Sequence, residues 1–279
     1  MASYSNTTGI TVTQTDVMLS ATNVTLAYDE RIVCEHLGVD IPRGQISVII
    51  GPNACGKSTL LRALSRLLTP QQGHVLLEGS DIHRLPTKAL ARKLGLLPQT
   101  SHAPSGITVG DLTARGRFPH QGFLQQWSEQ DEAAVEYALR ATELWDLVDR
   151  PVDELSGGQR QRVWIALLLA QDPGVLLLDE PTTYLDISNQ LEVLELCRRL
   201  NRDQGRTIVL VLHELSLAAR YADHVIVMSE GKNVASGPVA QVLTAELLKQ
   251  VFHIEARIIT DPVTGRPLVI PIRSTKEMA

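Results

Sequence analysis

The sequence is poor in cysteine, and it contains no long hydrophobic run. Its three cysteines, Cys34, Cys55 and Cys197, are too few and too widely spaced for a disulfide framework or a metal-binding motif. The longest unbroken apolar run, Val163 to Ala170, has eight residues, whereas a membrane-spanning helix needs about 20. The N-terminus lacks the basic and apolar regions of a secretory signal. We therefore expect a soluble protein of a reducing compartment.

The chain also lacks an excess of positive charge and is low in aromatic residues. It has 26 Lys and Arg against 31 Asp and Glu, a net charge of −5. This balance argues against a broad basic face, so no nucleic-acid partner is expected, although a local anion site is compatible with it. The 279 residues, 44% of them hydrophobic but only 4% aromatic, can form one large or two smaller domains with an aliphatic core.

The order of apolar segments predicts an α/β fold. Residues 1–16 are rich in Ser and Thr and are expected to be a flexible tail, and residues 17–41 read as short strands. Continuous apolar runs at 46–50, 175–178 and 207–212 predict parallel strands buried on both faces. Helices are expected at 57 to about 68 and at 128–148, the second within a helical insertion spanning about 100–155. Together these segments predict a sheet with helices on both faces.

A phosphate-binding motif follows the first buried strand. Residues 51–59 read GPNACGKST, which matches G-x-x-x-x-G-K-[ST] between a strand and a helix. The glycines let successive backbone N–H groups face one concavity at the helix N-terminus. Lys57 can reach the β- and γ-phosphates, and the Ser58 hydroxyl can bind Mg²⁺. The alternative, a loop that merely turns a strand into a helix, is disfavoured because Lys57 and Ser58 are both in register.

Two further motifs carry chemistry. VLLLDEPTT (175–183) places Asp179 and Glu180 at the end of a buried strand, where a carboxylate needs a cation or water as a partner. By the logic of phosphoryl transfer, Asp179 is assigned to the metal and Glu180 to the attacking water. LSGGQRQR (155–162) precedes an apolar helix, so Ser156, Gly157 and Gly158 offer a second anion site. Taken alone, this motif is more typical of an ordinary serine N-cap followed by two turn glycines.

These motifs together resemble the ATP-binding-cassette (ABC) ATPases from Val17 onward. The resemblance implies a P-loop NTPase cassette with a RecA-like α/β core, an N-terminal antiparallel β subdomain and an inserted α-helical subdomain. It implies an ATPase domain at 17–255, with the helical subdomain at about 100–160 and a C-terminal extension at 256–279. It also implies ATP and Mg²⁺ as cofactors.

The resemblance adds residues that no single motif assigns. Gln99 matches the family glutamine that contacts the metal and water, His213 the histidine at the γ-phosphate, and Asp186 the loop that crosses a dimer interface. Tyr28 matches the aromatic residue that stacks on adenine. The catalytic residues implied are Glu180, His213 and Gln99, and the metal ligands are Ser58, Gln99 and Asp179. The implied nucleotide-binding residues are Tyr28, Gly51, Pro52, Asn53, Ala54, Cys55, Gly56, Lys57, Ser58, Thr59, Ser156, Gly157, Gly158, Gln159 and Asp186.

Two positions depart from the family pattern. Ala54 occupies a site that is most often glycine, and Glu214 follows His213 where aspartate is usual. The first departure puts the backbone shape of the phosphate loop in doubt. Neither departure removes a group that the chemistry needs.

Within the family, the chain resembles the ATPase subunits of ferric siderophore importers. The similarity lies in residues 107–121, 150–171, 179–201 and 261–271. It implies a homodimer with shared ATP sites on the cytoplasmic face of the membrane, separate permease subunits and, indirectly, a periplasmic or lipid-anchored substrate-binding protein. The segment from Gln99 to about Gln126 is predicted to contact the permease and is called the docking segment here. Alternatives are a vitamin B12 or haem importer, or a stand-alone iron–sulfur assembly ATPase. Translation and DNA-repair cassettes are disfavoured, because the chain has one cassette and no long coiled coil.

Overall fold

The computed structural model describes residues 17–100, 102–122 and 127–275. The predicted N-terminal tail, the end of the docking segment at 123–126 and the last four residues of the C-terminal extension lie outside this range. In the described part, no helix is both long and apolar enough to cross a membrane.

A six-stranded sheet forms the centre of the molecule, with the strand order β10-β9-β3-β8-β7-β6. Its strands are parallel except for β10, which pairs antiparallel with β9. Every residue of β3, β7 and β8 is buried, as their continuous apolar sequences predict. The strands are β3 (Ile46–Ile50), β6 (Leu94–Leu97), β7 (Val175–Asp179), β8 (Thr207–Val211), β9 (His224–Ser229) and β10 (Lys232–Pro238).

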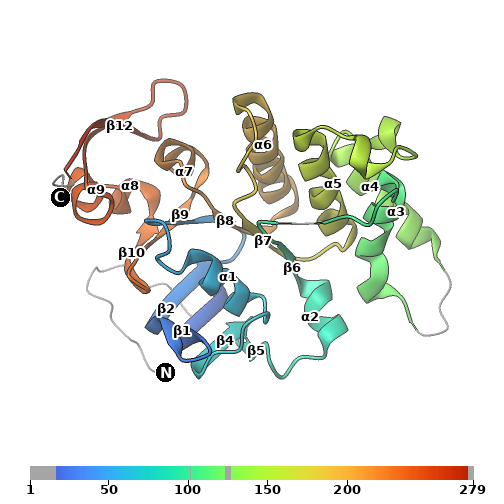
Figure 1. Cartoon of the computed structure of the whole chain (residues 1–279), viewed down its shortest axis with the longest axis horizontal. Coiled ribbons are helices and arrows are strands. Elements are labelled where there is room, and N and C mark those ends of the chain that lie inside the picture. Colours follow the sequence, from blue (N-terminus) through green and yellow to red (C-terminus); the bar gives the residue numbers. More distant parts are fainter. Residues whose placement is uncertain (1–16, 101, 123–126, 276–279) are drawn as a thin grey trace.

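A smaller antiparallel sheet covers one face of the central sheet together with helix α1 (Figure 1). Along β3 the side chains alternate: Ile49 faces the core shared with α1 and the smaller sheet, whereas Val48 faces the opposite core. This layer consists of α1 (Lys57–Leu64) and of strands β1 (Val17–Tyr28), β2 (Arg31–Pro42), β4 (Gln72–Leu77) and β5 (Ser80–Asp81).

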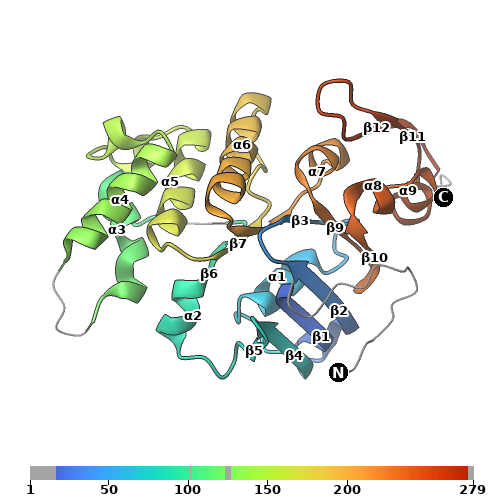
Figure 2. The same cartoon turned by 180° about the vertical axis from the view of Figure 1, so that it is seen from behind.

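Helices cover the other face, and the inserted helices extend to one side (Figures 1 and 2). The central helices are α5 (Gly157–Ala170), α6 (Ile187–Gln204) and α7 (Leu215–Tyr221). Beside them lie α3 (Val109–Ala114), α4 (Glu129–Ala141) and the 3-10 helices η2 (Arg115–His120), η3 (Trp145–Leu147) and η4 (Val152–Glu154). Helix α2 (Thr87–Lys93) lies instead on the side of the smaller sheet, where its Leu90 is buried. The predicted fold, a mixed α/β cassette with an antiparallel β part and inserted helices, is confirmed.

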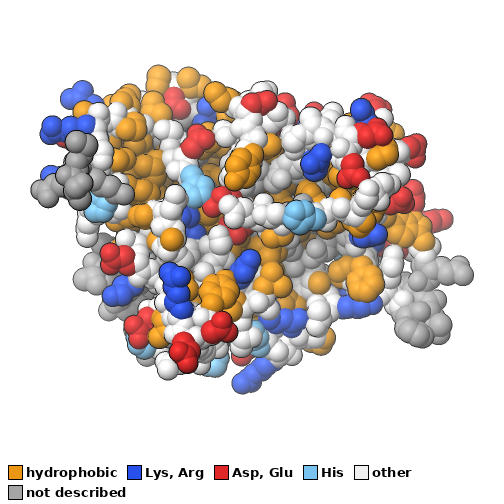
Figure 3. Space-filling view, in the orientation of Figure 1, with side chains coloured by type: hydrophobic (Ala, Val, Ile, Leu, Met, Phe, Trp, Pro, Cys, Tyr) orange, Lys and Arg blue, Asp and Glu red, His pale blue; other side chains and the backbone are white. Residues whose placement is uncertain are grey.

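The C-terminal elements form a compact unit at the opposite end from the inserted helices (Figure 1). They are α8 (Val239–Val242), α9 (Ala245–Phe252), β11 (Ile254–Thr260) and β12 (Pro267–Ser274), the last two pairing as an antiparallel hairpin. Ala256 and Val269 of the hairpin are buried in the same core as α5 and α6. Hydrophobic side chains gather over these elements at the upper left of Figure 3.

Two predicted helices end earlier than the sequence indicates. The first was expected to reach about Leu68, but α1 ends at Leu64, because Arg66 adopts a left-handed conformation and Leu67 and Leu68 both donate to the Arg62 carbonyl. The second was expected to reach residue 148, but α4 ends at Ala141, where the left-handed Glu143 turns the chain. In both cases a turn closed by backbone hydrogen bonds replaces apolar residues that fit a helical period.

Candidate active site

The phosphate-loop sequence lies between β3 and α1, as predicted, and its backbone is tightly constrained. A Cβ on Gly51 would lie 2.1 Å from the Met228 carbonyl oxygen, and Gly56 has φ +103°, a conformation that favours glycine. Ala54 has φ +60°, so this alanine adopts the left-handed conformation that its usual glycine would adopt without strain. The loop therefore keeps the glycine-type backbone despite the substitution.

Lys57 bends back over the loop. Its ammonium donates to the carbonyl oxygens of Gly51 at 3.0 Å and Pro52 at 2.9 Å, and the residue is only 5% exposed. These bonds satisfy the buried charge and fix the ammonium over the loop. Of the other loop residues, Cys55 and Thr59 are buried, Pro52 is partly buried, and Asn53 and Ala54 are exposed. An anion placed in the loop would meet one buried cation and the N-terminal end of α1.

Ser58 and Asp179 are hydrogen-bonded to each other at the carboxyl end of β7. The Ser58 hydroxyl donates to Oδ1 of Asp179 at 3.1 Å, joining the start of α1 to the end of β7. Burial raises the pKa of the Asp179 carboxyl, although the bond from Ser58 opposes that effect. A hydroxyl and a carboxylate oxygen are oxygen ligands of the kind that Mg²⁺ takes together with water and phosphate oxygens. The predicted metal ligands Ser58 and Asp179 therefore fit Mg²⁺.

Glu180 is the centre of a hydrogen-bonded cluster next to Asp179. The Gln99 amide donates to Oε2 of Glu180 at 2.7 Å, and Nε2 of His213 lies 2.5 Å from Oε1. The Thr183 hydroxyl also donates to Oε2, at 3.2 Å. Glu180 itself has φ +52°, an uncommon conformation for a side chain of this size. Three residues that the sequence places far apart, Gln99, Glu180 and His213, are thus brought together.

Thr183 was not predicted. The only available signal was its position three residues after Glu180 in the DEPTT sequence, and nothing in that spacing shows that its hydroxyl turns back to the carboxylate.

The signature residues lie at the N-terminus of α5. Ser156 and Gln159 form a capping box: the Ser156 hydroxyl accepts from the Gln159 N–H, and the Gln159 side chain accepts from the Ser156 N–H. Gly157 and Ser156 are exposed, and a Cβ on Gly158 would lie 2.2 Å from the Asn189 side-chain oxygen. Within the described residues, no hydrogen bond joins this segment to the phosphate loop. The signature therefore presents its open side to solvent.

Asp186 lies close to the signature, at the N-terminus of α6. Its carboxylate accepts from the backbone N–H of Asn189 at 2.9 Å and from the Asn189 amide at 2.8 Å. These bonds hold its pKa below the usual range. Asn189 therefore touches both Asp186 and Gly158, a connection that sequence reasoning missed because no motif includes Asn189.

Tyr28 and the cysteines complete the predicted set. Tyr28 lies at the end of β1, 40% exposed, and its hydroxyl accepts from Arg62 of α1 at 3.3 Å. The three cysteines are buried free thiols. Burial raises the pKa of Cys34 to about 11 and that of Cys197 to about 12, and it also raises the pKa of Cys55. The thiol of Cys55 is therefore a packing group in the phosphate loop at neutral pH.

The protein-family model described as "ABC transporter" matches residues 34–183, more than half of the chain. The chain belongs to the ABC transporter family. As an ABC transporter ATPase it binds ATP and couples ATP hydrolysis to transport.

Close relatives of this ABC transporter ATPase match over almost their whole length. The achromobactin transport ATP-binding protein CbrD of Dickeya dadantii (strain 3937) is 52% identical over 92% of this chain and 96% of its own. The ferric enterobactin transport ATP-binding protein FepC of Escherichia coli (strain K12) is 50% identical over 95% of this chain and 97% of its own. A solved metal-chelate type ABC transporter in an inward-facing conformation superposes with a TM-score of 0.79, at 28% identity, over 92% of this chain and 98% of that chain.

Proposed function

We propose that this chain is the ATP-hydrolysing subunit of an importer that carries ferric siderophores across the cytoplasmic membrane. The observation that carries the proposal is the identity of about half of all residues to CbrD and FepC over more than nine-tenths of the chain. Matches of this extent reach beyond the ATP-site motifs and span the docking segment between them. That segment is one that a particular permease would select.

The hydrolytic chemistry is assigned to residues of the cluster around Glu180. Lys57 and the loop from Gly51 to Thr59 bind the phosphates, and the Tyr28 ring stacks on the adenine. Glu180 accepts a proton from the attacking water, while Gln99 and His213, on its two oxygens, fix the carboxylate and contact the water and γ-phosphate. Ser58, Asp179 and Gln99 would hold Mg²⁺, which would supply positive charge to the phosphates.

The signature and Asp186 act on a second copy of the chain. Ser156, Gly157, Gly158, Gln159 and Asp186 would complete the ATP site of the partner in a two-fold symmetric homodimer. The exposure of this face supports the assignment: Tyr184 is 98% exposed and Ile187 is 77% exposed, next to Asp186. Large apolar side chains this open to solvent are typical of a surface that is covered by a partner.

The docking segment is assigned to the permease, and through it to the membrane surface. Within the segment Phe118 is 68% exposed, Lys88 of α2 lies over its ring, and Arg115 is exposed. Arg117, although basic, adds nothing to this exposed character, because it is buried in an ion pair with Asp131. Phe118 and Arg115 are therefore the residues proposed to contact the permease. The ATPase has no span of its own among the described residues, so the permease holds it at the cytoplasmic face, and the binding protein acts only through the permease.

Uptake of labelled iron by a deletion strain tests the function. The strain that carries this gene, with the gene deleted, should lose uptake of ⁵⁵Fe-labelled siderophores under iron limitation. The wild-type gene should restore uptake, whereas a Lys57→Ala gene should not, because the buried ammonium of the phosphate loop is lost. Normal siderophore uptake with a defect in vitamin B12 or haem uptake would assign the chain to those importers instead. A defect in iron–sulfur enzymes alone would favour the assembly ATPase.

A further inference from the structure

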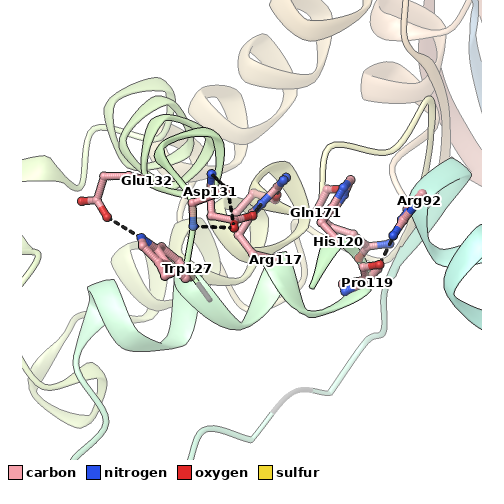
Figure 4. Close-up of polar contacts among 10 residues, drawn as sticks. Arg92, Arg117, Pro119, His120, Trp127, Asp131, Glu132 and Gln171 are labelled. Carbon is pink, nitrogen blue, oxygen red and sulfur yellow. Dashed lines mark hydrogen bonds and ion pairs between the residues drawn. The ribbon is translucent and has the colours of Figure 1, made fainter. Parts of the chain in front are cut away.

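Gln171, immediately after helix α5, contacts three segments at once. Its backbone carbonyl oxygen accepts from Nε2 of His120, at 2.8 Å, in the docking segment. Its side-chain amide donates to the carbonyl oxygen of Ala91 at the end of α2 and to that of Leu94 at the start of β6, the latter at 3.1 Å. Figure 4 shows Gln171 beside His120, with Arg92 and Pro119 next to them. No other side chain in the described part of the chain donates to both α2 and β6.

Two of the segments that meet at Gln171 lead to the ATP site. Helix α5 begins at Gly157 in the exposed signature, with Ser156 as its N-cap. Its 14 residues make a rigid rod of about 21 Å at 1.5 Å per residue. Strand β6 leads directly into Gln99, which donates to Glu180. The docking segment, which contacts Gln171 through His120, carries the exposed Phe118. Gln171 is therefore the point where the permease-facing surface meets the signature helix and the strand that leads to Gln99.

The neighbouring contacts attach the docking segment firmly at this point. Arg117 donates to the Ala170 carbonyl oxygen at 2.8 Å, and Arg92 of α2 donates to the Pro119 carbonyl oxygen at 2.9 Å. A Cβ on Gly95 of β6 would lie 3.3 Å from the Gln171 amide nitrogen and 2.3 Å from Leu168 of α5. Strand and helix thus approach at a glycine without room for a side chain. Hydrogen bonds and close packing thus connect η2, α5 and β6. A displacement of η2 must therefore also move α5 or β6.

We infer that Gln171 is a positioning residue that couples movement of the docking segment to the signature helix and to the Gln99 strand. The inference rests on the proposed function, since it takes the docking segment to be the permease contact. Gln171 lies outside the phosphate loop and the Glu180 cluster, so it does not act on the reacting atoms. Its effect is expected on the stimulation of hydrolysis by the permease, rather than on hydrolysis by the isolated subunit.

The test compares Gln171→Leu with wild type, both as the isolated subunit and reconstituted with its permease in liposomes. Leucine keeps most of the side-chain volume and removes both amide donors. The kcat and KM for ATP of the isolated subunit should stay within about twofold of wild type, while stimulation by the permease falls by about fivefold or more. Gln241→Leu, an exposed glutamine of α8, is the matched control and should leave both rates unchanged. A second variant, Gln171→Glu, places a carboxylate against two carbonyl oxygens and should reduce stimulation at least as much.

The outcomes separate this inference from the function on which it rests. If the wild-type subunit is not stimulated by the permease, the assignment of the docking segment is wrong and the inference falls with it. If wild type is stimulated and both Gln171 variants are stimulated equally well, the inference is wrong and the proposed function stands. Equal losses in the isolated subunit and in the transporter would also overturn it, because they would show a structural role only.

Discussion

Arg117 and Asp131 form a buried ion pair inside the inserted helices. Nε of Arg117 lies 2.8 Å from Oδ1 of Asp131, and both side chains are 7% exposed. Burial alone would raise the pKa of Asp131, but hydrogen bonds from Ser128 and Arg117 outweigh it and hold that pKa below the usual range. Arg117 also donates to the Ala170 carbonyl oxygen. This one side chain of η2 therefore contacts both α4, where Asp131 lies (Figure 4), and the end of α5.

Replacing Asp131 should therefore destabilise the protein strongly. In Asp131→Asn the guanidinium of Arg117 stays buried without its counter-charge, which costs about 3–5 kcal/mol of unfolding free energy. Urea unfolding at pH 7 measures this loss. Glu136→Gln is the control, because the Glu136–Arg140 pair on the same helix is exposed and such pairs contribute at most about 1 kcal/mol.

The same pair predicts a pH dependence with a definite sign. The pKa of Asp131 is lower in the folded chain than the ordinary aspartate value of 3.8, so the carboxylate contributes stability above that pH and loses it as the pH falls through the folded pKa. The difference in unfolding free energy between wild type and Asp131→Asn should hence shrink below about pH 4. A difference that stays constant down to pH 2 would contradict this account.

The left-handed Ala54 predicts a stabilising substitution. Glycine adopts φ +60° freely, whereas this backbone conformation costs an alanine about 1 kcal/mol of conformational free energy. Ala54→Gly should therefore raise the unfolding free energy by about 0.5 kcal/mol, after the entropy of the more flexible unfolded chain is subtracted. Thermal unfolding checks this. Ala133→Gly, at an exposed position of α4, should instead lower stability by about 1 kcal/mol. A loss of stability in both variants would show that Ala54 is unstrained.

The C-terminal hairpin should stabilise the core through Arg266. Its guanidinium donates to Oδ1 of Asp223 at 3.0 Å, and Oδ2 of Asp223 accepts from the backbone N–H of Ile46 at the start of β3. Arg266→Ala and Asp223→Asn should be non-additive, with a coupling of about 1 kcal/mol in a double-mutant cycle of unfolding free energies. Strict additivity would mean that the hairpin is fastened by its apolar contacts alone.

Most of the fold could be predicted from local sequence patterns. The apolar runs of β3, β7 and β8 are continuous enough to predict buried parallel strands, and the motif at 51–59 locates the loop between strand and helix. Helix ends were less predictable. Leu68 and Leu147 continue a helical period, but left-handed turns at Arg66 and Glu143 end the helices first. Such turns depend on backbone hydrogen bonds that side-chain periodicity does not encode.

The predicted site residues form two separate groups in the structure: the residues around Glu180 and the phosphate loop, and the signature residues with Asp186. Gln99, Glu180 and His213 meet because three strand ends lie along one edge of the central sheet, which strand order explains. The burial of Arg117 could not be read from the sequence, since a charged residue in a loop is usually exposed and its partner Asp131 lies 14 positions further along the chain. Thr183, Asn189 and Gln171 were missed for the same reason: their roles follow from tertiary contacts rather than from any motif.

Single-turnover ATP hydrolysis by Glu180→Gln tests the central claim, that this carboxylate accepts the proton of the attacking water. The glutamine keeps the size of the side chain that Gln99, Thr183 and His213 surround but cannot take a proton. ATP affinity should stay close to wild type and an ATP-bound dimer should accumulate, while the rate of hydrolysis falls by about 100-fold or more. Glu246→Gln, at an exposed position of α9, should hydrolyse ATP normally. Hydrolysis by Glu180→Gln at the wild-type rate would contradict the assignment.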